Sequence, residues 1–186
     1  MKNKENKYDK TYLRMAREWG NLSYCRRRKV GALIVKDRMI ISDGYNGTPT
    51  GMENICEDDE NYTKWYVLHA EANAIMKVAS STQSCAGATL YVTLSPCTDC
   101  SKLIYQAGIV RVVYIDQYKD TTGIQFLKDA GAEVVQIANP YWFYQLSQRI
   151  ERLWLIVQHK RLPTILSTKF CFFLIKFQNH NQNKKY

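Results

Sequence analysis

The sequence predicts an α/β fold with three α-β-α layers, in which helices cover both faces of a mixed five-stranded sheet. From residue 70 to residue 137, short β-branched runs alternate with helix-like segments, and such alternation is typical of a sheet with helices on its faces. Earlier in the chain, two strand-like runs flank Lys36-Asp37, which predicts an antiparallel hairpin. A hairpin joined to alternating helices and strands makes the sheet mixed.

The first half of the chain is predicted to supply one helix, the hairpin and a long loop. Apolar side chains recur at helical spacing in residues 8–25 and indicate an amphipathic helix. The two hairpin strands fall within residues 30–46. Residues 46–61 combine Gly, Pro, Asn and acidic side chains, a composition that predicts a loop.

The second half of the chain is predicted to alternate strands and helices, followed by an extension. The expected helices are residues 70–80, 97–108 and 121–131, and the expected strands are residues 88–94, 110–115 and 132–137. Asn139-Pro140 then marks a boundary. We therefore expect one domain over residues 1–140 and a basic, aromatic-rich extension over residues 141–186, partly helical or disordered.

The charge distribution argues against a nucleic-acid partner. The net charge is +9, but residues 1–140 carry 18 Lys and Arg against 16 Asp and Glu, whereas residues 141–186 carry 8 against one. The main domain is therefore nearly neutral, as expected for an enzyme that acts on a small molecule. The lysine-rich start is not followed by an apolar segment, and no stretch approaches the roughly 20 apolar residues that span a bilayer. We expect a cytoplasmic protein with no membrane partner.

Two short motifs carry the residue types that bind zinc. Without a secretion signal, the six cysteines are not expected to form a disulfide framework. Cys97 and Cys100 begin a predicted helix, where the helix dipole favours thiolates. Alone, this pair fits zinc, a redox dithiol or chance, although the chain lacks the thioredoxin-like order expected of a redox dithiol. His69 begins another predicted helix and adds a third ligand, which leaves the fourth tetrahedral position open for water, as in catalytic zinc sites.

Glu71 favours a hydrolytic site. A carboxylate two residues after a zinc-binding histidine can face the metal-bound water without binding the metal. Zinc lowers the pKa of that water to about 7, and Glu71 would take its proton and pass it on. The alternative is that Glu71 serves only as a helix former. His-x-Glu followed by Pro-Cys-x-x-Cys is the signature of zinc nucleobase deaminases, in which hydroxide attacks C4 of cytosine or C6 of adenine.

Longer stretches resemble the deoxycytidylate (dCMP) deaminases. The similar segments, within residues 8–138, are VGALIV, DGYNGTP, HAEANAI, GATLYVTLSPCTDC, AGIVRVVY and the tyrosine of DQYKD. The resemblance implies the cytidine-deaminase-like fold, with residues 1–140 as the catalytic domain. It implies zinc-dependent hydrolysis of dCMP to dUMP and ammonia, which supplies thymidylate synthesis, with one catalytic Zn²⁺ ion. It further implies a homo-hexamer activated by dCTP and inhibited by dTTP, with Mg²⁺ accompanying a triphosphate effector.

The resemblance also implies roles for individual residues. His69, Cys97 and Cys100 match the zinc ligands, and Glu71 matches the proton shuttle. Three further residues match or could reach positions that contact substrate, namely Asn46, Asn73 and Tyr118. Their alternative explanations are a turn asparagine, a residue of a helix N-terminal turn, and a packed tyrosine.

A run of four basic residues precedes the first hairpin strand. Arg26, Arg27, Arg28 and Lys29 could bind a 5′-phosphate or an effector triphosphate, or could form a solvated surface. Some relatives carry a second, structural zinc with cysteines near Cys25 and Cys56 and a histidine from a longer insertion. That insertion is short in this sequence, so two ordinary buried cysteines are expected.

Two other functions stay open. A tRNA adenosine deaminase would share the zinc site and suit a basic tail, but the nearly neutral domain and the combination of GYNGTP with HAEANAI argue against it. A catalytically silent zinc-dependent binding module would need Glu71 to be lost or the water position to be blocked. The sequence shows neither change.

Overall fold

The computed structural model describes residues 2–137, and the predictions for residues 141–186 lie outside this part of the chain. The helices are α1 (Lys2–Gly20), α2 (Ala70–Ala79), α3 (Thr98–Gln106) and α4 (Thr122–Asp129). The strands are β1 (Gly31–Lys36), β2 (Met39–Tyr45), β3 (Thr89–Leu94), β4 (Arg111–Asp116) and β5 (Glu133–Gln136). None of the helices within residues 2–137 is long and apolar enough to cross a membrane.

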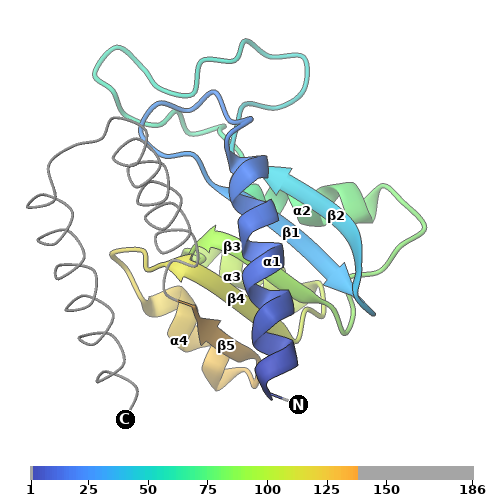
Figure 1. The fold of residues 1–186 in the computed structure, drawn as a ribbon. Helices are drawn as coiled ribbons and strands as arrows, with labels where there is room; N and C mark the ends of the chain where they lie inside the picture. The colour runs from blue at the N-terminus through green and yellow to red at the C-terminus, as the bar shows by residue number, and fades with distance from the viewer. Residues whose placement is uncertain (1, 138–186) are drawn as a thin grey trace, which may run out of the picture. The chain divides into compact units, whose positions relative to one another are not determined.

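The predicted mixed five-stranded sheet is confirmed, with the strand order β2-β1-β3-β4-β5 (Figure 1). Strand β1 pairs antiparallel with both β2 and β3, while β3, β4 and β5 are parallel. The β1–β2 turn places Asp37 and Arg38 at φ values of 50° and 65°. Two consecutive residues in this left-handed region produce a turn whose twist matches that of the flanking strands.

Alternation along the strands divides the core into two layers. On β1, Leu33 and Val35 pack with Leu13 and Ala16 of α1. The intervening residues of β1 point to the opposite face, where the core contains side chains from α2, α3 and α4. Because successive strand residues face opposite sides, the sheet separates α1 from the other three helices, as Figure 1 shows. This arrangement is the predicted three-layer fold.

Helix α1 ends earlier than the sequence predicts. It ends at Gly20 rather than near residue 25, because helix and sheet approach each other closely at this point. A Cβ atom on Gly20 would lie 2.9 Å from the Gly31 nitrogen at the start of β1. Residues 21–30 therefore leave the helix and run beside the loop that connects β2 to α2.

A disulfide joins these two loop segments. Cys25 and Cys56 are bonded, with their Cα atoms 5.1 Å apart. The expectation of two ordinary cysteines is right about burial, since they are 2% and 1% exposed, but wrong about the bond. The pairing arises because the early end of α1 brings residue 25 against a loop 31 residues further along the chain.

Candidate functional site

The three predicted zinc ligands lie at the N-termini of two neighbouring helices. His69 is the N-cap of α2, with an extended backbone at φ −76° and ψ 156°. Cys97 is the N-cap of α3, with φ −75° and ψ 174°, and Cys100 lies in the first turn of that helix. Neither N-cap side chain makes a capping hydrogen bond. The imidazole and the thiol are therefore available to each other across the space between the helices.

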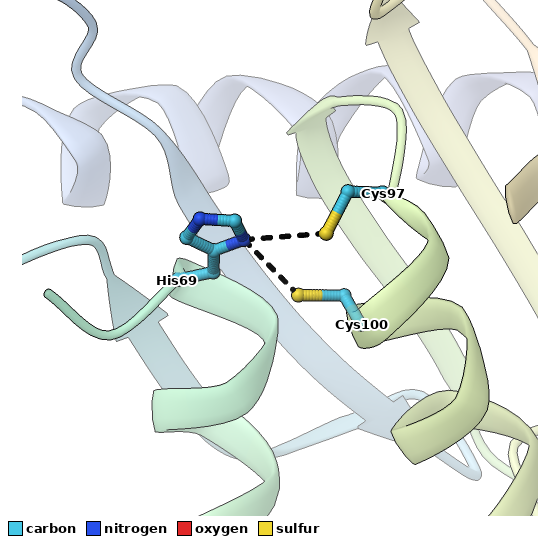
Figure 2. Close-up of side chains that lie close together, drawn as sticks. All are labelled: His69, Cys97 and Cys100. Atoms are coloured by element: carbon cyan, nitrogen blue, oxygen red, sulfur yellow. Dashed lines mark hydrogen bonds between the residues drawn. The ribbon is translucent and has the colours of Figure 1, made fainter. Parts of the chain in front are cut away.

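The ligand atoms converge on one point (Figure 2). Nδ1 of His69 lies 3.5 Å from Sγ of Cys97 and 3.3 Å from Sγ of Cys100. All three ligand atoms lie within 4.8 Å of one another, and no other cluster of this kind occurs within residues 2–137. Ligands around a tetrahedral zinc, with bonds of about 2.0–2.3 Å, lie roughly 3.5–3.8 Å apart. The nitrogen and two sulfurs fit that ion in chemistry and in spacing.

The three groups also shift one another's ionisation. Hydrogen bonds from Cys100 and His69 lower the pKa of the Cys97 thiol to about 4. The hydrogen bond to Cys97 and burial raise the pKa of Cys100, while the hydrogen bond to Cys97 raises that of His69. The low pKa favours the thiolate form of Cys97 at neutral pH, whereas a metal that binds both sulfurs must displace the proton of Cys100.

Glu71 lies in the first turn of α2, beside the ligand cluster but outside it. Its side chain is 4% exposed, and burial raises the pKa of its carboxyl above the ordinary value. A carboxyl group that is not held in its ionised form can both accept a proton and return it. Its position and environment suit proton transfer better than metal binding.

The cluster opens into a cavity of about 340 Å³, here called the site cavity. This volume lies in the range of small-molecule sites. Its lining includes His69, Glu71 and Cys97 together with Arg27, Arg28, Asn46 and Tyr118. Seven of the predicted site residues, distant in sequence, therefore face one cavity.

Two predicted phosphate contacts lie outside the lining of the site cavity. Arg26 turns toward Glu57, with its Nε 3.6 Å from a carboxylate oxygen. Lys29 donates a hydrogen bond from Nζ to the carbonyl of Asn21 (3.3 Å) and lines a neighbouring cavity with Arg17. Within the basic run, Arg27 and Arg28 are thus the two side chains that line the site cavity.

The two predicted asparagines are engaged with the backbone. Asn46 accepts a hydrogen bond from the Val30 N–H (2.8 Å) and donates one to the Arg28 carbonyl (2.9 Å). Asn73 donates to the Tyr45 carbonyl (2.7 Å) and does not line the site cavity. Both side chains therefore connect segments of the site, and their contact with substrate stays a prediction.

Sequence reasoning missed several residues of the site cavity. The additional polar ones are Glu57, Thr63, Ser95 and Lys119. Ser95 accepts a hydrogen bond from the N–H of Tyr118 (2.7 Å) and so fixes the loop that carries this tyrosine. Ser95 could have been noticed as the residue before Pro96-Cys97. Glu57 had no such signal, because it stands in a run of acidic residues.

Close packing holds the first cysteine ligand in place. Gly123, in the first turn of α4, lies directly against the start of α3. A Cβ atom there would lie 2.8 Å from the carbonyl oxygen of Cys97 and 2.6 Å from Oγ of Ser101. A side chain at this position would have to displace the backbone of a predicted zinc ligand.

Comparisons with known proteins identify the family of this chain. Residues 6–116 match the family described as the cytidine and deoxycytidylate deaminase zinc-binding region. The deoxycytidylate deaminase of Enterobacteria phage T4 is 35% identical over 170 residues, covering 68% of this chain and 88% of the phage protein. Human deoxycytidylate deaminase is 44% identical over 106 residues, covering 50% of this chain and 56% of the human protein.

A solved structure shows the same fold. The dCMP deaminase of cyanophage S-TIM5, determined in complex with dCMP and dUMP, is 44% identical with a TM-score of 0.67. The match covers 68% of this chain and 94% of the cyanophage chain. With the family match over residues 6–116 and the similarity to phage enzymes over 88% and 94% of their lengths, we conclude that this chain belongs to the cytidine and deoxycytidylate deaminase family.

Proposed function

We propose that this protein is a zinc-dependent dCMP deaminase, which hydrolyses dCMP to dUMP and ammonia. One observation carries the proposal: a His-Cys-Cys cluster and a buried glutamate share a cavity with Arg27 and Arg28. The first two features suit hydrolytic deamination, and the arginines suit a substrate with a phosphate. The relatives named as deoxycytidylate deaminases, and the neighbour that binds dCMP and dUMP, support this choice of nucleotide.

His69, Cys97 and Cys100 would hold the zinc ion. When bound, zinc supplies an acidified water that can act as a nucleophile at neutral pH. The positions of the ligands at two helix N-termini favour the thiolate forms of the cysteines. Their proximity to one end of the site cavity means that the reacting carbon of the base would lie at this end.

Glu71 would move the proton. It faces the same cavity, and its raised pKa suits a group that must exist in both ionisation states during one turnover. The carboxylate would take a proton from the attacking water and deliver it to the ring nitrogen beside the reacting carbon. After the new C–O bond forms, Glu71 would take the proton of the new hydroxyl and deliver it to the exocyclic amine; the C–N bond then breaks, ammonia leaves, and the oxygen is left as the carbonyl of dUMP.

Arg27 and Arg28 would bind the 5′-phosphate. Arginine donates paired hydrogen bonds that match phosphate oxygens, and both side chains line the site cavity. Tyr118, whose backbone N–H donates to Ser95, would contact the base or the sugar. The hexamer, activation by dCTP with Mg²⁺ and inhibition by dTTP stay predictions from the resemblance.

The test is turnover of defined nucleotides by protein with measured zinc content. We expect ammonia release and a change in ultraviolet absorbance with dCMP, and much less with CMP, dCTP or deoxycytidine. Glu71→Ala should lose at least about a hundredfold in kcat, the usual contribution of a general base, while keeping its zinc. Glu60→Ala, which removes an exposed carboxylate, is the matched control and should retain full activity.

Two results would overturn the proposal. Absence of turnover with all four compounds, in protein that carries zinc, would remove the nucleotide assignment. Activity on a tRNA anticodon stem-loop in its place would favour the adenosine deaminase alternative. Retention of full activity in Glu71→Ala would remove the role of this residue in proton transfer.

A further inference from the structure

Glu57 is a buried carboxylate inside the site cavity that the reaction does not use. It lies in the acidic run CEDDE, yet it is 3% exposed, whereas the acidic residues after it are exposed. Its Oε1 accepts hydrogen bonds from the backbone N–H groups of Arg26 (2.9 Å) and Arg27 (3.1 Å). Its Oε2 lies 3.6 Å from Nε of Arg26.

The position of this carboxylate is unexpected for a site that binds an anion. Burying a carboxylate costs several kcal/mol of desolvation free energy unless hydrogen bonds compensate for it. A negative charge near a phosphate would also weaken substrate binding through repulsion. Both penalties suggest that Glu57 contributes something to the site that outweighs them.

Its hydrogen bonds indicate what this contribution is. By accepting from two consecutive N–H groups, Glu57 fixes the peptide planes that precede Arg28. Asn46 holds the other side of the same segment through the Arg28 carbonyl and the Val30 N–H. The segment that carries Arg27 and Arg28 is therefore held from both sides where these two residues line the site cavity.

A second contact joins the same loop to the arginines. Nη1 of Arg27 donates to Oγ1 of Thr63 (3.3 Å), and Thr63 pairs with Glu57 in an isolated β-bridge. Next to Glu57, the Cys25–Cys56 disulfide joins the two segments covalently. Glu57 thus lies at the point where this loop and the basic segment are fastened together.

We propose that Glu57 is a positioning residue for the 5′-phosphate. It strengthens binding of a nucleoside monophosphate by holding the backbone of Arg26 and Arg27, in spite of its own negative charge. The proposal rests on the proposed function, because it takes the substrate to be a nucleotide with a 5′-phosphate. It gives Glu57 no contact with the substrate and no part in proton transfer.

Three substitutions separate positioning from simple electrostatics. Glu57→Ala removes the acceptor, Glu57→Asp keeps the charge but shortens its reach, and Glu57→Gln keeps the reach but removes the charge. If Glu57 acts only through its charge, Glu57→Ala and Glu57→Gln should both lower the KM for dCMP. If it positions the backbone, Glu57→Ala and Glu57→Asp should raise KM about tenfold, as expected for the loss of hydrogen bonds from two backbone donors.

The expected pattern has three parts. The kcat of each variant stays within about twofold of the wild type, because no group at the reacting carbon changes. Glu57→Gln stays within about threefold of the wild-type KM, since its amide oxygen can still accept both hydrogen bonds. Asp59→Ala, which removes an exposed carboxylate of the same loop, leaves KM unchanged. The dissociation constant for dUMP, measured by calorimetry, should follow KM.

Amide hydrogen exchange tests the proposal independently of catalysis. The N–H groups of Arg26 and Arg27 should exchange faster in Glu57→Ala and Glu57→Asp, and at the wild-type rate in Glu57→Gln. Unchanged exchange, or a KM that falls in Glu57→Ala, would overturn the positioning role. If the wild type does not turn over dCMP, the proposed function fails, whereas the exchange pattern still decides whether Glu57 holds the segment. If Glu57→Ala does not fold, the comparison between Glu57→Asp and Glu57→Gln gives the same decision.

Discussion

Replacing Asp9 with alanine is expected to destabilise the protein by about 3–5 kcal/mol, the usual effect of removing one partner of a buried ion pair. Asp9 is 3% exposed and accepts a hydrogen bond on each carboxylate oxygen from the two Nη atoms of Arg111 (2.8 and 2.9 Å). The hydroxyl of Tyr91 donates to the same carboxylate (2.8 Å). These contacts connect α1 to β3 and β4, across 82 and 102 residues of sequence.

The magnitude follows from what the substitution leaves behind. The side chain of Arg111 is 12% exposed, so its charge would stay largely out of water. Its remaining ion pair, with Glu133 at 3.0 Å, involves a carboxylate that is 62% exposed, and pairs of this kind contribute little. The buried hydroxyl of Tyr91 would also lose its acceptor, at a cost of about 1–3 kcal/mol that is included in the total.

Urea unfolding followed by circular dichroism measures the effect. Asp116→Ala is the matched control, because it removes a carboxylate that pairs with an arginine at 3.8 Å but is 62% exposed. The control should change the free energy of unfolding by less than about 1 kcal/mol. Arg111→Leu should also be destabilising. The double variant with Asp9→Leu and Arg111→Leu should lose less free energy of unfolding than the two single variants lose together. A loss below about 1 kcal/mol in Asp9→Ala, or strict additivity in the double variant, would refute the reasoning.

Three further measurements concern the buried phenol, the zinc cluster and the disulfide. Burial raises the pKa of Tyr91 above 10.0, so above about pH 10 the unfolded chain releases a proton that the folded protein keeps, and stability falls as pH rises. Tyr91→Phe should reduce that fall by up to about 1.4 kcal/mol per pH unit. If the free energy of unfolding depends on pH with the same slope in the wild type and in Tyr91→Phe between pH 9 and 11, the prediction is wrong. Gly123→Ala places a methyl group against the backbone of Cys97, and overpacking of this kind costs about 1–3 kcal/mol. Because this strain falls on a zinc ligand, zinc affinity should drop by about tenfold or more. Gly47→Ala, whose added carbon meets nothing closer than 3.8 Å, should bind zinc with the wild-type affinity. An unchanged zinc affinity in Gly123→Ala would contradict the prediction. Denatured without reductant and with a chelator, the protein should be alkylated at Cys85, Cys97 and Cys100 but not at Cys25 and Cys56, which are joined; peptide mapping that finds Cys25 and Cys56 alkylated would exclude the disulfide.

The element order could be predicted because it depends on local patterns. Hydrophobic periodicity and turn residues indicated the hairpin and the following strands and helices, and each element lies within about two residues of its expected bounds except α1, which was expected within residues 8–25 and spans Lys2–Gly20, so that both its start and its end differ. That end depends on the close approach of Gly20 to Gly31, a contact between two elements that periodicity does not report.

The reactive groups could also be predicted from the sequence, because their motifs are short and each begins a helix. His69, Glu71, Cys97 and Cys100 are identified by residue type and spacing, and the fold brings their side chains together. The family resemblance added Asn46 and Tyr118, although it did not show that the amide of Asn46 is engaged with the backbone.

The sequence by itself thus determined the order of the elements, the family and the residue types at the reacting end of the cavity. Only the tertiary structure decided which acidic residue of the CEDDE run is buried, which arginines enter the cavity and which cysteines pair. The physical reason is that these features depend on contacts between segments distant in sequence. Glu57 is buried, unlike the acidic residues after it, where residues 26 and 27 direct two N–H groups at its carboxylate.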